Sequence, residues 1–399
     1  MINFIHNIFT FNFRKKEILT EPYRLRNAIL SRLNLQKRIF IKSYDMIMMS
    51  IEKILGAFWF VTSGQRPLRK VIVRKKPRIL VWRPRFFANV GEEGLPQKYF
   101  FGALEKRQIE VDTFFCDTER KLLGNQVDFY KKIMDSQYDS VIFYCYDSSY
   151  FTAPSLKVLK KVKKKISTQF IAIWEDTIGK LFLKKIMDTS PLFDMHVFND
   201  NPNFRDKFDL LSEDERRKVF IPPGNMHVVS PSSGLENTAR ERNIDVFFSG
   251  RVGSYRSYRK DTLMYLIENG VSGYINFFLS ETNLDNEEYY KLLSMSKIAI
   301  NFSYSNEGHQ LKGRALEAIS VGAMLLESEN PQISCFFEDG TDYVSFSSKE
   351  DLLEKIGYYL KNSEERVRIA KNGMRKVAEL YHPHNYWEKI FEKIGIDLK

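Results

Sequence analysis

The chain has 399 residues, a hydrophobic share of 43% and a formal net charge of +11 at pH 7. This composition excludes a wholly disordered protein, and the length is sufficient for two domains that each have their own core. The three cysteines, Cys116, Cys145 and Cys335, show no paired spacing, so neither a disulfide framework nor a cysteine zinc site is supported. We expect a cytoplasmic protein, since the sequence has neither a secretory signal nor an apolar run of about 18 residues.

The excess positive charge lies at the start of the chain. Residues 1–78 hold 17 Lys and Arg against four Asp and Glu. We assign residues 1–76 to a basic, partly amphipathic helical extension, in which the stretch 46–61 is largely apolar and ends in aromatic residues. Such a helix favours peripheral binding to an anionic membrane surface, while packing on the first domain explains the pattern equally well. Nucleic acid is not expected as a partner, because no recognition motif accompanies the charge.

From residue 77 onward, short apolar stretches alternate with helical patterns in two series. The alternation predicts an α/β protein with two doubly wound, mostly parallel, Rossmann-like domains that face a cleft. We expect a first Rossmann-like domain at 77–235, a second at 236–378, and a C-terminal helix in 379–399 that can cross back to the first domain. The predicted strands are 78–82, 111–115, 140–144, 168–174, 195–198, 218–221, 244–248, 273–278, 298–302 and 324–326, and the predicted helices are 97–106, 153–164, 179–187, 260–269, 287–295 and 314–321.

The segment 306–328 holds the strongest candidate for a ligand site. A helix that opens behind a glycine-containing loop presents unpaired backbone N–H groups and a positive dipole end. With Lys312 and Arg314 beside it, this helix start suits a phosphate. Glu317, one turn into the helix, can accept two hydroxyl donors of a ribose or another sugar. The alternative is a solvated helix face on which these charges form a local ion pair.

The stretch from Lys312 to Gly322 and the segments after it resemble the C-terminal domain of GT-B glycosyltransferases, most closely the group-1 branch that includes the CgeB-like proteins. The resemblance covers residues 243–390 and continues through Leu325-Leu326, Phe336–Gly340, Tyr343-Val344 and Tyr381–Trp387. It implies that residues 77–235 form the acceptor domain and residues 236–378 the nucleotide-sugar-binding domain. It also implies that Glu317 binds the ribose of a nucleotide sugar and that neighbouring basic residues hold its pyrophosphate. The paired glutamates of better-known relatives lie eight positions apart, whereas Glu307 and Glu317 are ten apart.

Other candidates follow predicted strands. Gly250 and Arg251 come directly after strand 244–248, where the glycine allows close backbone approach and the resemblance assigns the arginine to the donor pyrophosphate; a plain turn is the alternative. Asp176 resembles an aspartate of CgeB-like sequences and could orient or deprotonate an acceptor hydroxyl, or it could cap the next helix. His309 lies beside the binding helix, where it can touch the donor sugar.

The sequence therefore predicts a glycosyltransferase that moves a sugar from a nucleoside diphosphate donor to a hydroxyl of a glycan or lipid-linked acceptor, in the synthesis of surface polysaccharides or glycoconjugates. The resemblance favours retention of anomeric configuration. No metal or other cofactor is expected, because no Asp-x-Asp triplet occurs and no His or Cys pair has metal-ligand spacing. The alternatives are a nucleotide-sugar epimerase of the same fold and a non-catalytic glycan-binding protein.

Overall fold

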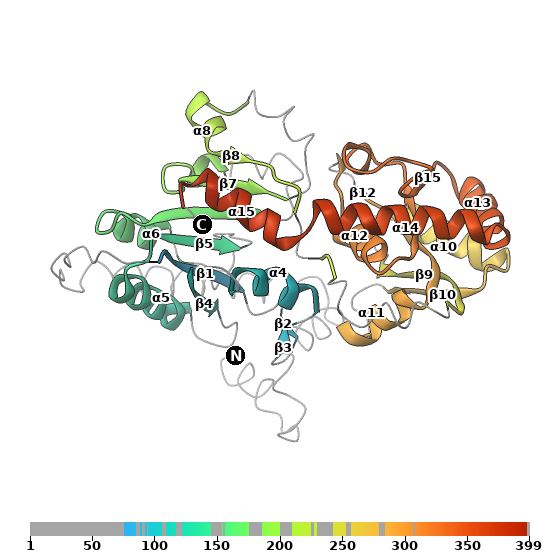
Figure 1. Ribbon diagram of the computed structural model, residues 1–399, viewed down its shortest axis with the longest axis horizontal. Coiled ribbons are helices and arrows are strands. Elements are labelled where there is room, and N and C mark those ends of the chain that lie inside the picture. Colours follow the sequence, from blue (N-terminus) through green and yellow to red (C-terminus); the bar gives the residue numbers. More distant parts are fainter. Residues whose placement is uncertain are drawn as a thin grey trace, which may run out of the picture. The chain divides into compact units, whose positions relative to one another are not determined.

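The computed structural model describes most of the chain from residue 76 onward (Figure 1). These residues all lie in Gln65–Lys399, the second of the two units into which the chain divides. The helical extension expected at 1–76 lies outside the described residues, apart from Lys76 itself. The described ranges are 76–84, 88–89, 92–93, 95–105, 109–116, 122–144, 154, 156–174, 186–199, 210–224, 227–229, 242–252, 257–278, 284–305 and 308–396.

The first sheet has six parallel strands in the order β4-β1-β5-β6-β7-β8 (Figure 1). Its strands are β1 (Arg78–Pro84), β4 (Glu110–Cys116), β5 (Ser140–Tyr144), β6 (Gln169–Trp174), β7 (Met195–Phe198) and β8 (Val219–Phe220). The helices of this half are α4 (Leu95–Glu105), α5 (Leu122–Ser136), α6 (Leu156–Lys163) and α8 (Glu213–Arg217), and the short strands β2 (Ala88–Asn89) and β3 (Glu92–Glu93) pair antiparallel.

Both faces of the first sheet are buried, which explains its continuous apolar strands. Every residue of β5 is buried. On β1, Ile79 and Val81 pack into a cluster with Phe100 of α4. Trp82 points to the opposite face, where its ring lies 6.0 Å from that of Phe143.

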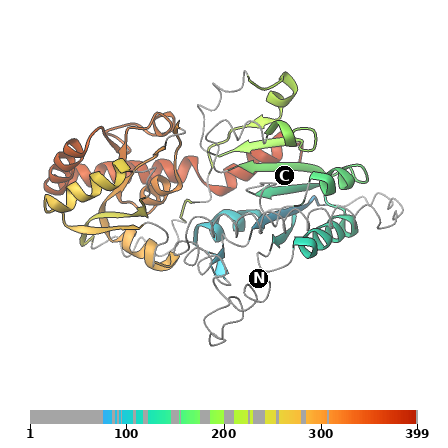
Figure 2. The same cartoon turned by 180° about the vertical axis from the view of Figure 1, so that it is seen from behind.

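The second sheet has five parallel strands in the order β10-β9-β11-β14-β15, seen from behind in Figure 2. Its strands are β9 (Ile244–Arg251), β10 (Gly273–Phe278), β11 (Ser296–Asn301), β14 (Met324–Ser328) and β15 (Val344–Phe346). The helices are α10 (Ser257–Glu268), α11 (Asn286–Ser294), α12 (Gly313–Ser320), α13 (Lys349–Lys361), α14 (Ser363–Leu380) and α15 (Pro383–Lys393), with a hairpin of β12 (Tyr304–Ser305) and β13 (Gly308–His309) and a 3-10 turn at Ile333–Cys335.

Helix α12 ends as its sequence predicts. Gly322 adopts a left-handed conformation with φ of 74°. Its N–H donates to the carbonyl of Ile319, and the N–H of Ala323 donates to that of Ala318. This pair of bonds is the Schellman pattern, which satisfies the last carbonyls of a helix and favours glycine at the left-handed position. The chain then turns directly into the buried strand β14.

The last helix packs on the first sheet, although it follows the second sheet in sequence. Helix α15 contributes Tyr386, Trp387 and Ile390 to the cluster that contains Ile79 and Val81 of β1. The indole Nε1 of Trp387 donates to the carbonyl of Phe100 at 2.8 Å. Helix α14, which precedes α15, packs instead against α12 and β14 of the second half.

The fold class is confirmed: the described residues form two parallel-sheet, Rossmann-like α/β halves. Strands 140–144, 195–198 and 273–278 have the predicted bounds. The prediction that strand 244–248 ends before Gly250 is wrong. Strand β9 continues to Arg251, because residues 249–251 pair with residues 276–278 of the neighbouring strand β10. Most of the helix predicted at 179–187 lies outside the described residues.

Candidate functional site

The strand order of the second sheet identifies where a ligand would bind. The chain passes from β9 to β10 on one side and then returns to β11 on the other, so the order reverses between β9 and β11. In parallel α/β sheets, ligands bind beyond the carboxyl ends of strands at such a reversal. Gly250 and Arg251 stand at the carboxyl end of β9, and Asn301 stands at that of β11.

The side chain of Glu317 is the centre of the site. It lies on α12 and is only 7% exposed. Its Oε1 lies 2.8 Å from Nδ1 of His227, and its Oε2 accepts a 2.8 Å hydrogen bond from the hydroxyl of Tyr289. For Glu317, the interpretation as part of a solvated helix face is wrong, because residues distant in sequence cover the carboxylate.

The environment of Glu317 keeps it ionised. Burial alone raises the pKa of a carboxyl group, since it disfavours the charged form. Here the hydrogen bond and charge of His227, the hydrogen bond from Tyr289 and the charge of Arg314 outweigh burial, so the pKa of Glu317 is lowered. Burial, followed by the nearby charge of Glu317, raises the pKa of Tyr289 well above its ordinary value. Tyr289 therefore remains a hydroxyl donor to an anionic carboxylate.

Arg314 lies directly over the backbone of Gly250. A Cβ atom on Gly250 would come within 2.3 Å of Nη1 of Arg314 and 2.8 Å of the ring of Phe248. A side chain at position 250 would therefore displace the guanidinium from its place over the end of β9. Two residues that the sequence analysis selected from separate segments, Gly250 and Arg314, are brought together in this way.

Lys312 occupies the N-cap position of α12 and makes no capping bond with its side chain. Its ammonium instead donates to Oε1 of Gln310 at 2.9 Å. The carbonyl of Gln310 in turn accepts a bond from the side-chain amide of Asn330. Lys312 thus stands at the start of α12, and its role in holding a phosphate there stays a prediction.

The remaining predicted residues are placed as follows. Arg251 has an exposed side chain, and its carbonyl accepts a 3.1 Å bond from the buried guanidinium of Arg259. His309 is half-buried on β13, opposite Tyr304. Asp176 lies outside the described residues, so its predicted acceptor role stays a prediction.

His196, a buried strand residue, is structural. Its Nδ1 accepts a bond from the indole of Trp174 at 3.2 Å. Burial lowers its pKa to about 3, so the ring is neutral at physiological pH.

Sequence reasoning missed His227 and Tyr289. They are separated from Glu317 by 90 and 28 residues along the chain. His227 lies between strands β8 and β9, and Tyr289 lies on α11. Neither carries a local sequence signal, because their role depends on tertiary contact with α12.

A second buried glutamate, Glu327, lies on β14. It is paired in register with Asn301, whose side-chain amide donates to Glu327 Oε2 at 2.7 Å. Burial raises the pKa of Glu327 to about 7, against the lowering effects of Ser303, Asn301 and Arg259. In the described part of the chain, no three His, Cys, Asp or Glu side chains lie together in a way that could hold a metal ion. Within the same ranges, no helix is long and apolar enough to cross a membrane.

Comparison with known proteins agrees with this architecture. A family model described as glycosyl transferase-like matches residues 270–392. An alpha-glucosyltransferase in complex with UDP and a 13-mer DNA has a TM-score of 0.54 and 12% identity, with 80% of this chain and 100% of that chain covered. Sucrose-phosphate synthase from Thermosynechococcus elongatus has a TM-score of 0.53 and 10% identity, with coverage of 80% and 99%.

The N-terminal domain of Candida albicans trehalose-6-phosphate phosphatase has a TM-score of 0.51 and 10% identity, with coverage of 83% and 99%. These likenesses show the fold, two Rossmann-like domains of the GT-B type. A search of curated proteins finds no match.

Proposed function

We propose that the protein transfers a sugar from a nucleoside diphosphate sugar to a hydroxyl of an acceptor. The observation that carries the proposal is the ionised, buried carboxylate of Glu317 beside Arg314, which itself lies over Gly250 at the strand-order reversal. A carboxylate offers about four lone-pair sites; His227 and Tyr289 contact one on each oxygen, and Tyr290 also hydrogen-bonds to Glu317. In this proposal, lone pairs that these side chains leave unoccupied accept the ribose hydroxyls.

The cations at this site suit the diphosphate. Arg314 and Lys312 stand at the start of α12, and Arg251 stands at the end of β9. In sugar transfer, negative charge grows on the departing diphosphate as the glycosidic bond breaks. Fixed cations and helix N–H groups aimed at that charge stabilise the transition state without rearranging. That no metal takes part stays a prediction.

The donor sugar and the acceptor involve two other residues in this proposal. His309 lies eight positions before Glu317, the spacing at which better-known relatives carry their first paired glutamate, so we assign it to the donor sugar. Asp176 would orient or deprotonate the acceptor hydroxyl. Several further points remain predictions. They are retention of configuration, a glycan or lipid-linked acceptor and a role in surface polysaccharide or glycoconjugate synthesis. The cytoplasmic location and binding to an anionic membrane also remain predictions.

Donor binding tests the proposal. Isothermal titration of the full chain with UDP, GDP, ADP and CDP identifies the base, and the matching nucleoside is titrated beside the preferred diphosphate. Glu317→Gln should weaken binding of both ligands by roughly 1.5–3 kcal/mol, about ten- to a hundredfold, because charged hydrogen bonds to the ribose are lost. Arg314→Met should weaken binding of the diphosphate far more than that of the nucleoside.

Glu354→Gln is the matched control, since Glu354 is exposed on α13. It should leave both affinities unchanged. Unaltered affinity in Glu317→Gln would exclude the ribose assignment. Equal losses for diphosphate and nucleoside in Arg314→Met would show that this arginine acts on structure. Once the donor is known, turnover of the nucleotide sugar without an acceptor to an epimeric product indicates the epimerase, and glycan binding without turnover indicates the binding protein.

A further inference from the structure

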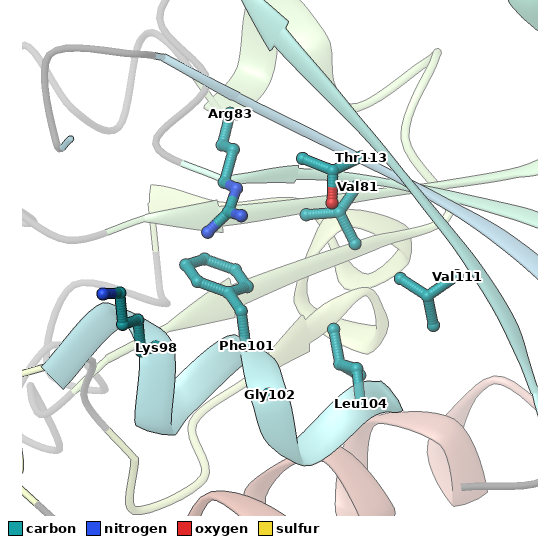
Figure 3. A pocket seen from close by; sticks show the side chains of 8 residues that line it. All are labelled: Val81, Arg83, Lys98, Phe101, Gly102, Leu104, Val111 and Thr113. Carbon is teal, nitrogen blue, oxygen red and sulfur yellow. The ribbon is translucent and has the colours of Figure 1, made fainter. Parts of the chain in front are cut away.

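A cavity lies in the first half of the molecule, between α4 and the strands β1 and β4. It has a volume of about 200 Å³ (Figure 3). Strand β4 is the edge of the first sheet, and β1 is its neighbour. The cavity is lined by Val81, Arg83, Lys98, Phe101, Gly102, Leu104, Val111 and Thr113.

One end of the cavity is cationic. The side chain of Arg83 is buried, and its guanidinium carbon lies 4.0 Å from the ring centre of Phe101 and 4.6 Å from that of Phe115. Two aromatic faces hold the guanidinium in place. Lys98 supplies a second cation at this end, and the hydroxyl of Thr113 is also at the cavity wall (Figure 3).

The other end is apolar. Leu104 and Val111 lie away from the guanidinium, and Val81 lines the cavity between Arg83 and Val111 (Figure 3). Gly102 faces open space, because a Cβ added there would meet no atom within 4 Å. Glycine inside a helix is unfavourable relative to alanine. Gly102 therefore lowers the stability of α4 and leaves the space beside it unfilled.

We propose that this cavity binds a small organic anion, with a phosphate or carboxylate group at Arg83 and Lys98 and an apolar body against Leu104 and Val111. The size is suitable, since an apolar cavity of about 150 Å³ accommodates benzene. A planar guanidinium fixed by aromatic rings recognises the two oxygens of such a group through paired N–H donors. The proposal does not depend on the function assigned to Glu317, because all lining residues belong to the first sheet and α4.

Phenyl phosphate is the probe that tests both ends of the cavity. Calorimetric titration of the full chain should show binding of phenyl phosphate, with benzyl alcohol and inorganic phosphate each at least about tenfold weaker. Arg83→Met should weaken phenyl phosphate binding by about tenfold or more, because the charge-assisted bonds are lost. Benzoate replaces phenyl phosphate in a parallel titration and determines which anionic group the cavity prefers.

Position 102 supplies a matched pair of variants that leave both cations in place. Gly102→Leu projects a side chain into the cavity and should abolish phenyl phosphate binding. Gly102→Ala adds only a methyl group, so binding should persist while the melting temperature rises. Unchanged affinity in Gly102→Leu, absence of binding to the parent protein, or equal affinity for inorganic phosphate would each overturn the proposal. Melting curves of all variants verify that they are folded.

Discussion

Two buried glutamates in the second half, Glu317 and Glu327, experience opposite environments. Hydrogen bonds from His227 and Tyr289 and the charge of Arg314 stabilise the ionised form of Glu317. Glu327 is completely buried on β14, and Oε1 has no hydrogen-bond partner among the described residues. Burial therefore dominates at Glu327, and its pKa rises to about 7. The same side chain thus holds its negative charge at one position and takes up a proton much more readily at the other.

This difference predicts a pH-dependent effect of Glu327→Gln on stability. The pKa of Glu327 rises from 4.5 to about 7 on folding, so its destabilising effect is absent below about pH 4.5 and complete above about pH 7. Glutamine resembles the protonated form. The variant should be more stable than the parent at pH 8, by up to roughly 3 kcal/mol, and the advantage should shrink towards pH 5.

Urea unfolding at pH 5, 6, 7 and 8 measures this effect. Glu354→Gln, at an exposed position on α13, controls for the general loss of a negative charge and should show little change at any of these pH values. A stability difference between Glu327→Gln and the parent that is the same at every pH would contradict the assigned titration.

At the scale of elements, the turn between α12 and β14 connects the candidate site to the sheet. Gly322 adopts φ of 74° and lies next to Arg242, whose Nη2 donates to the carbonyl of Val321 at 2.8 Å. A Cβ on Gly322 would come within 3.0 Å of that nitrogen. The position therefore carries both a conformational and a packing requirement for glycine.

Gly322→Ala and Gly340→Ala separate these two requirements. Gly340 has the same φ of 74°, but a Cβ there would meet nothing within 4 Å. Gly340→Ala should cost about 1 kcal/mol from the left-handed conformation alone, and Gly322→Ala should cost more because Arg242 must move. Denaturant unfolding of both variants provides the measurement. Equal losses would show that Arg242 adjusts freely.

At the scale of the whole molecule, the C-terminal helix completes the core of the first sheet. Trp387 is completely buried in the cluster that contains Ile79 and Val81, and its indole donates to the carbonyl of Phe100. Tyr386 also reaches the first half, where its hydroxyl donates to Oδ1 of Asn199 at 2.8 Å. The first sheet is therefore completed by residues at the far end of the chain.

Trp387→Ala tests that dependence. Removal of a large buried aromatic side chain should cost about 3–5 kcal/mol. Glu388→Ala, at the exposed neighbouring position, should cost little. Circular dichroism during urea unfolding compares the two variants, and similar midpoints for both would show that α15 contributes little to the stability of the first half.

The class of fold and several element boundaries follow from local sequence patterns alone. Strand residues 140–144 form a continuous apolar run, which is the pattern of a parallel strand buried on both faces. Residues 314–321 have one apolar face and are followed by glycine, so the helix and its end could both be predicted. These features depend on local periodicity and backbone preference, which neighbouring residues specify.

The surroundings of the candidate side chains depend on tertiary contacts. Glu317 could be a solvated helix residue or a buried ligand-binding carboxylate until His227 and Tyr289 were placed against it. Gly250 belongs to a strand beneath Arg314 because β9 pairs with β10 beyond its predicted end. Burial, pKa and close approach depend on atoms contributed by segments tens of residues away, and the periodicity of one segment contains no information about which other segment covers it.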